Sequence, residues 1–157
     1  MEGIRVRGIE AGDAEAVSEI ICRNLIEVNS RNYTPQEINS YVEHFTPETI
    51  MRLAGERNML VAEGTEGVVG TASLGTFGKA RDNNWTVFTV FVKTDCHGRG
   101  IGRILMDEVE ELAKGKGISE LTVPSGITAC DFYKKLGYNE VEYLEDKKIH
   151  IMRKRIL

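Results

Sequence analysis

The stretch VKTDCHGRGIG, residues 92–102, joins the end of a predicted buried strand to the start of a predicted amphipathic helix. Three glycines at alternate positions, Gly98, Gly100 and Gly102, let the backbone approach a ligand closely. The unpaired N–H groups of the first helical turn and the helix dipole favour an anion at this place. The stretch therefore predicts a turn that binds phosphate or pyrophosphate, with a tight turn that binds nothing as the alternative.

The spacing of these glycines excludes two common nucleotide-binding patterns. The dinucleotide pattern G-x-G-x-x-G fails because Arg103 stands where its last glycine would be. The phosphate-loop pattern G-x-x-x-x-G-K-[ST] does not occur anywhere in the chain. The glycines alone thus leave the identity of the anion open.

The segments on either side of this turn have clear structural signals. Upstream, residues 85–92 read WTVFTVFV and are apolar or β-branched throughout, which predicts a strand buried on both faces in the middle of a sheet. Downstream, apolar residues recur at helical spacing and predict a helix from about residue 101 to Lys116: Ile101, Leu105, Val109 and Leu112.

Further elements are predicted along the rest of the chain. Asp13 is the predicted cap of a helix that runs to about Asn29, and Thr34 and Thr46, each followed by Pro, predict the starts of two short helices. The other predicted elements are a strand near residues 4–9, a hairpin of strands 59–63 and 68–74, a strand 121–123, a helix 128–136 and strands 139–144 and 149–155. This order predicts one α/β (α+β) domain over residues 1–157 with a mixed sheet.

Composition narrows the class of protein. A chain of 157 residues with 41% hydrophobic residues can bury a core without a metal or disulfides. The three cysteines form no C-x-x-C pair, which favours a reducing, cytoplasmic location. The net charge of −4 argues against nucleic-acid binding, and no apolar run approaches the roughly 18 residues of a membrane span.

A second motif, GITACDFYKKLGY at residues 126–138, lies a short distance after the glycine turn. Together, the two segments resemble the GCN5-related N-acetyltransferase (GNAT) family. Residues 97–102 are similar to its signature Arg/Gln-x-x-Gly-x-Gly/Ala, and residues 129–138 are similar to its signature Ala-x-x-Phe-Tyr-x-x-x-Gly-Phe/Tyr. The motifs occupy about residues 85–144, and the order of the predicted elements extends the resemblance over nearly the whole chain.

The resemblance implies the GNAT fold, a single mixed central sheet of about six to seven strands flanked by about four to five helices, with splayed central strands. It also implies an enzyme that transfers an acetyl group from acetyl-CoA to a primary amine by direct attack. The acceptor would be a small molecule or a peptide, with no nucleic acid or membrane as partner, and the protein would be a monomer or a homodimer.

The resemblance also assigns residues to the cofactor and to the chemistry. Tyr133 would lie beside the coenzyme sulfur and act as the general acid that protonates the departing thiolate. Without the resemblance, the sequence would indicate that Tyr133 is an ordinary aromatic residue of the core. The residues expected to contact the cofactor are Phe91, Val92, His97, Gly98, Arg99, Gly100, Ile101, Gly102, Arg103 and Tyr133.

The sequence departs from the family pattern at three places. His97 stands where Arg or Gln is usual, and Gly126 stands where Asn often precedes the alanine. Strand 85–92 carries no carboxylate, although many relatives place a Glu there, so the general base stays unidentified among Glu63, Asp95, His97 and a water chain. Because of these departures, a non-catalytic sensor of acyl-CoA remains an alternative function. A module that binds ATP or NAD is a further alternative.

The acceptor site and any metal site have weak signals. Tyr33, Tyr41, Phe45 and the loop 78–84 are the expected acceptor lining, although the three aromatics also fit plain helix packing. His44 and His150 are isolated in the sequence, and Cys130 reads as a packed thiol. The sequence therefore predicts no metal site.

Overall fold

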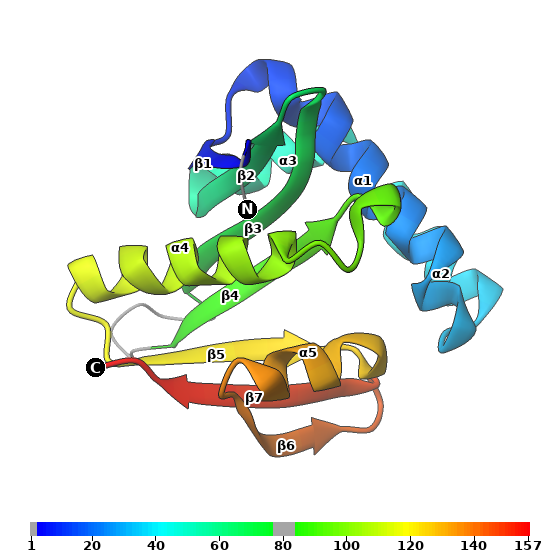
Figure 1. Ribbon diagram of the computed structural model, residues 1–157. Helices are drawn as coiled ribbons and strands as arrows, with labels where there is room; N and C mark the ends of the chain where they lie inside the picture. Colours follow the sequence, from blue (N-terminus) through cyan, green and yellow to red (C-terminus); the bar gives the residue numbers. More distant parts are fainter. Residues whose placement is uncertain (1–2, 77–83) are drawn as a thin grey trace.

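The computed structural model describes residues 3–76 and 84–157 (Figure 1). Its strands form one seven-stranded sheet in the order β1-β2-β3-β4-β5-β7-β6. The central β4 and β5 run parallel, and the other neighbours are antiparallel. The strands are β1 (Arg5–Gly8), β2 (Asn58–Gly64), β3 (Gly67–Thr76), β4 (Trp85–Val92), β5 (Glu120–Ser125), β6 (Asn139–Leu144) and β7 (Ile149–Arg155). The predicted mixed sheet in an α/β domain is confirmed.

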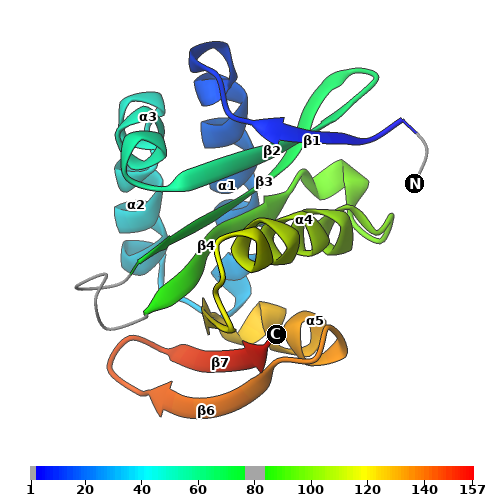
Figure 2. The same ribbon diagram turned by 90° about the vertical axis from the view of Figure 1, so that its left-hand side faces the viewer.

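Helices cover both faces of the sheet (Figure 2). One face carries α1 (Ala14–Glu27), α2 (Pro35–His44) and α3 (Pro47–Glu56), and the other carries α4 (Ile101–Gly115) and α5 (Cys130–Lys135). Val61 and Ala62 on β2 are both fully buried, but neighbouring strand residues point to opposite faces. Val61 therefore packs in the core under α1 to α3, and Ala62 packs in the core under α4 and α5.

The predicted starts of α2 and α3 are confirmed by their caps. The Thr34 hydroxyl accepts a hydrogen bond from the Glu37 N–H at 3.1 Å, and the Glu37 carboxylate accepts one from the Thr34 N–H at 2.8 Å. The Thr46 hydroxyl accepts from the Thr49 N–H at 3.2 Å. Each threonine thus satisfies an N–H group that the first helical turn leaves unpaired.

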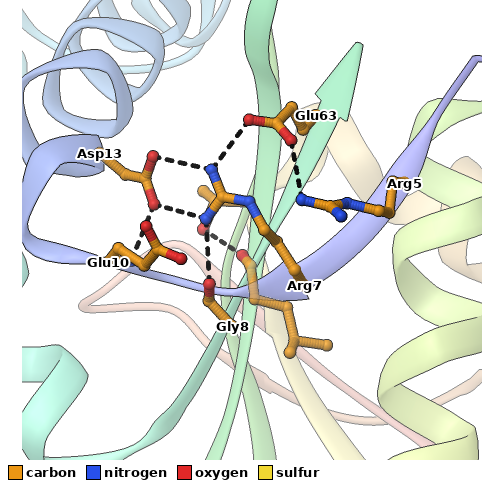
Figure 3. Close-up of polar contacts among 8 residues, drawn as sticks. Arg5, Arg7, Gly8, Glu10, Asp13 and Glu63 are labelled. Atoms are coloured by element: carbon orange, nitrogen blue, oxygen red, sulfur yellow. Dashed lines mark hydrogen bonds and ion pairs between the residues drawn. The ribbon is translucent and has the colours of Figure 1, made fainter.

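Asp13 is the N-cap residue of α1, as predicted, but its side chain makes no capping bond to that helix and binds Arg7 instead (Figure 3). The Arg7 guanidinium donates to both Asp13 oxygens, at 2.8 and 3.0 Å, and to Glu63 at 3.0 Å. These bonds hold the pKa values of both carboxyls below their usual range. The network fastens β1 to β2 and to the start of α1.

Two other predictions need adjustment. The helix predicted at 128–136 is a 3-10 turn, Ile127–Ala129, followed by α5. The strand predicted to be buried on both faces, β4, has only Thr86 and Val87 buried, and its remaining residues are partly exposed. The second difference has a physical cause, since the far half of β4 forms the wall of a cavity. No helix in the described ranges has the length and apolar composition needed to cross a bilayer.

Candidate functional site

The two central strands pair briefly and then separate. Thr86 on β4 lies opposite Thr122 on β5, and within the described residues this is the single registered pair between them. Figure 1 shows the strands diverging beyond that point. The divergence opens a slot in the middle of the sheet, as the predicted splayed strands require.

A β-bulge in β4 accompanies the divergence. Thr89 and Val90 together oppose a single residue of β3, because Phe88 pairs with Ser73 and Phe91 pairs with Thr71. Thr89 adopts a φ of 49°, and a bulge of this kind bends its strand. The Ser73 hydroxyl lies 3.0 Å from the Phe88 carbonyl oxygen and 2.9 Å from the Thr89 hydroxyl, which ties the bulge to β3.

The slot continues into a cavity of about 470 Å³. Its walls come from the end of α1, the far half of β4, the turn before α4, the first residues of α4, and the segment that leads into α5. Every residue expected to contact the cofactor lines this cavity except Arg99, which is exposed on the turn. The lining residues are Asn24, Val28, Asn29, Val90, Phe91, Val92, Cys96, His97, Gly98, Gly100, Ile101, Gly102, Arg103, Thr128, Ala129, Phe132 and Tyr133.

The glycine turn has the backbone conformation that its sequence requires. Gly98 and Gly100 have φ values of 79° and 81°, in the left-handed region that other residues enter only with strain. A Cβ on Gly102 would meet the Phe132 ring at 3.0 Å, so glycine permits the close packing of α4 and α5. The first N–H groups of α4 have no partner within the helix. They lie on the cavity wall, where they can bind an anion.

The end of β4 presents backbone groups to the slot. The Lys93 N–H donates to the Val69 carbonyl on β3 at 2.7 Å. Backbone groups of successive strand residues point to opposite edges, so the N–H and carbonyl of Val92 point away from β3. The carbonyl is already bonded, because it accepts from the Asn24 side-chain amide and from His97 Nε2, each at 2.8 Å. The Val92 N–H is the group that faces the slot.

Tyr133 lies in the cavity wall with 5% of its surface exposed. Its ring packs edge-on against the rings of Phe132 and Tyr138, with 5.1 and 5.9 Å between the ring centroids. Burial raises the pKa of the phenol, so Tyr133 keeps its proton at neutral pH. No hydrogen bond to its hydroxyl comes from the residues that the structure describes, whereas the Tyr138 hydroxyl donates to Glu110 at 3.0 Å.

The candidate bases named from the sequence lie in different places. Glu63 is bound by Arg5 and Arg7 at the other end of the sheet and does not line the cavity. Asp95 is exposed, and its Oδ1 lies 3.7 Å from Nη2 of Arg23. His97 is on the cavity wall. Among the described lining residues there is no carboxylate.

A second cavity, of about 300 Å³, includes Ile127 of the turn before α5 in its lining. Of the expected acceptor-lining residues, Tyr33 contributes to it, whereas Tyr41 and Phe45 line neither cavity. Tyr41 packs edge-on against Tyr33 at 6.1 Å. Residues 78–83 of the predicted lining lie outside the described residues. The second cavity is lined by Asn32, Tyr33, Ile127, Tyr143, Lys148 and His150.

Two features of the site escaped sequence reasoning. Asn24 is a buried polar residue on the apolar face of α1, and this interruption of the stripe was its available signal. His150 is isolated in the sequence, but Cys130 and Glu140 lie beside it in the fold. These three residues come from separate elements, and no spacing in the sequence connects them.

Comparison with known proteins gives a family and one curated relative. The profile of the family described as "Acetyltransferase (GNAT) domain" matches residues 29–152. The uncharacterized protein YyaT of Bacillus subtilis (strain 168) is 34% identical over 55 residues, which are 34% of this chain. That match spans 37% of the length of YyaT.

Solved structures share the fold at low sequence identity. The PaiA N-acetyltransferase of Thermoplasma acidophilum, solved with coenzyme A, has a TM-score of 0.85 at 20% identity and covers 97% of this chain and 98% of its own. YncA of Salmonella typhimurium, solved with acetyl-CoA, has a TM-score of 0.72 at 17% identity. The match covers 99% of this chain and 95% of the YncA chain. The seven-stranded arrangement described above is thus shared along nearly the whole chain.

Proposed function

Because this chain belongs to the GNAT acetyltransferase family, we propose that it transfers an acetyl group from acetyl-CoA to a primary amine by direct attack, with Tyr133 as general acid. The acceptor is a small molecule or a peptide. PaiA of T. acidophilum and YncA of S. typhimurium, which share the fold, were solved with coenzyme A and with acetyl-CoA, respectively.

The observation that carries this proposal is the cavity beside the far half of β4, which offers groups suited to the pyrophosphate and to the pantetheine arm of the cofactor. The unpaired amides at the start of α4 suit a pyrophosphate, and Arg103 beside them adds positive charge. The Val92 N–H suits a carbonyl of the pantetheine arm, which can lie along β4 like an added strand. The absence of a side chain at Gly102 lets the first turn of α4 lie against the Phe132 ring, which also lines the cavity.

Tyr133 supports the chemical part of the proposal. Acetyl-CoA supplies an acetyl thioester, and expulsion of its thiolate is assisted by a proton. At neutral pH the Tyr133 phenol carries the proton that the leaving sulfur needs, although burial raises its pKa and so makes it a weaker acid. Because its hydroxyl is not committed to another described residue, donation breaks no existing hydrogen bond.

One observation favours the sensor as a second candidate. The described lining of the cavity contains no carboxylate to deprotonate an incoming ammonium group, so a protein that binds acyl-CoA without turnover has the same geometry. A transferase with this lining would take its amine already neutral or lose the proton through water. The two candidates differ in turnover and not in binding.

Turnover is tested with purified protein, acetyl-CoA and a panel of primary amines that includes polyamines, amino acids and short peptides. Release of free coenzyme A thiol is measured together with the mass of the acetylated product. Direct attack predicts intersecting double-reciprocal plots, whereas an acetyl-enzyme would give parallel ones. Tight binding of acetyl-CoA without any product from the panel, at pH values up to 9, would favour the sensor.

A further inference from the structure

Three side chains with metal-binding atoms converge where the sheet meets α5. They are Cys130 on α5, Glu140 on β6 and His150 on β7, and their ligand atoms all lie within 4.8 Å of one another. The strand register explains part of this arrangement. Glu140 pairs with Met152, two residues beyond His150, so Glu140 and His150 project from the same face of the sheet. The buried Cys130 completes the group from α5.

The chemistry of the three donors selects one kind of metal. A thiolate sulfur, an imidazole nitrogen and a carboxylate oxygen form a typical ligand set for Zn²⁺, whereas Mg²⁺ and Ca²⁺ prefer oxygen alone. We propose that Cys130, Glu140 and His150 bind a zinc ion in a three-ligand site. His150 also lines the second cavity, so a fourth ligand can approach from that cavity.

The surroundings of Cys130 suit a bound thiolate. The Ser125 hydroxyl lies 3.8 Å from the Cys130 sulfur and 2.8 Å from the Gly126 carbonyl oxygen. In the metal-free protein its single hydrogen can go to the carbonyl, while the Cys130 thiol donates to the same carbonyl at 3.5 Å. When the metal displaces the thiol proton, the Ser125 hydroxyl can turn to the sulfur and stabilise it, as outer-shell donors do.

Glu140 and His150 must move slightly apart before both can bind the same metal ion. Glu140 Oε1 lies 2.5 Å from His150 Nδ1, closer than the roughly 3.3 Å between two ligand atoms of a tetrahedral zinc site. The Glu140 side chain is 39% exposed and is free to move outward by this amount. Binding therefore exchanges two hydrogen bonds, Glu140–His150 and Cys130–Gly126, for three metal bonds, and the thiol proton passes to solvent.

Cobalt(II) titration of the full metal-free chain tests the site, because Co²⁺ replaces Zn²⁺ and reports its ligands. A thiolate ligand gives a near-ultraviolet charge-transfer band, and four-coordinate geometry gives strong visible bands. Cys130→Ser removes the ligand, and Cys22→Ser is the matched control, since Cys22 lies on α1 outside the cluster. Glu140→Gln tests the second ligand at constant size, and His150→Gln tests the third with a side chain of similar length.

The proposal predicts a charge-transfer band in the wild type and in Cys22→Ser, its loss in Cys130→Ser, and its displacement by Zn²⁺. Zinc affinity, measured by chelator competition, should fall at least about tenfold in Glu140→Gln and His150→Gln. Absence of the band from the folded wild type, or its persistence in Cys130→Ser, would overturn the proposal. Acetyl transfer is not part of the readout, so this result is independent of the proposed function.

Discussion

Thr86 on β4 and Thr122 on β5 lie opposite each other where the two parallel central strands begin to diverge. Beyond this pair, β4 carries the bulge at Thr89, and the residues that follow the bulge on β4 line the cavity. The position of the pair therefore decides where the slot begins and which residues of β4 face it. Tyr133, Gly102 and Asn24 each belong to a different part of the wall of that slot, so substitutions at these three positions test it separately.

Replacing Tyr133 with Phe should lower kcat by about 10²-fold or more, because the departing thiolate loses its proton donor. The dissociation constant for acetyl-CoA should stay nearly unchanged, since the ring and its packing remain. Tyr138→Phe is the matched control, because its hydroxyl bonds Glu110 and is outside the cavity lining. Steady-state kinetics and calorimetry on both variants separate the effects. Full turnover in Tyr133→Phe would remove the acid role.

Replacing Gly102 with Ala should weaken acetyl-CoA binding by about tenfold, or about 1.4 kcal/mol. The added Cβ would press on the Phe132 ring at 3.0 Å and shift the first turn of α4, whose amides face the cavity. Gly115→Ala, at the other end of α4, meets no atom within 4 Å and should leave binding unchanged. Calorimetric titration of both variants checks this. Equal affinities would mean that the start of α4 does not contact the cofactor.

Replacing Asn24 with Leu should destabilise the protein by about 2 kcal/mol, because its amide bonds the Ile20 and Val92 carbonyls. It should also weaken cofactor binding several-fold, since the end of β4 loses its connection to α1. Ser18→Ala is the control on the same helix, because Ser18 bonds the Phe45 carbonyl away from the cavity. Urea unfolding and calorimetry should show both variants destabilised and only Asn24→Leu impaired in binding.

Acid should destabilise the protein partly through Asp13. Its hydrogen bonds to Arg7 lower its pKa below the ordinary value of 3.8, against the opposing effect of burial. The stabilisation is therefore complete above pH 3.8 and is lost as the pH falls through the lower folded-state pKa. Asp13→Asn should cost about 1 kcal/mol at pH 7 and show a smaller further loss in acid.

Urea unfolding of the wild type and Asp13→Asn at pH 7 and pH 3 measures this difference. Glu63 shares Arg7 and its pKa is also lowered, so part of the acid sensitivity should remain in the variant. If the two proteins lost equal stability between these pH values, the network at Arg7 would not explain the acid sensitivity.

Local signals predicted most of the fold. Thr34 and Thr46 marked two helix starts because capping depends on residues only three positions apart. The apolar run of β4 identified a central strand, but the bulge at Thr89 was invisible, since threonine normally disfavours a positive φ. The burial of β4 was overestimated for the same reason, because the bulge and the divergence from β5 expose its far half.

Residues of the site that are far apart in the sequence and meet only in the fold could not be predicted from local patterns. The glycine turn and Tyr133 were found because each lies in a continuous motif. Cys130, Glu140 and His150 were missed because their meeting depends on the register of β6 and β7 against α5, which no local pattern encodes. Asn24 contacts Val92 across 68 positions of sequence, and it differed from its neighbours only as a polar residue on an apolar stripe.

The most direct test of the proposed function is thermal unfolding of the purified protein with acetyl-CoA, set beside coenzyme A, ATP and NAD at equal concentration. Acetyl-CoA at 100 times its dissociation constant should stabilise the protein by about 2.7 kcal/mol, which raises Tm by about 5 to 11 °C. Coenzyme A should give a comparable shift, and ATP and NAD should give little. No shift with millimolar acetyl-CoA on the folded protein would contradict the assignment of the cavity beside the far half of β4 as its binding site.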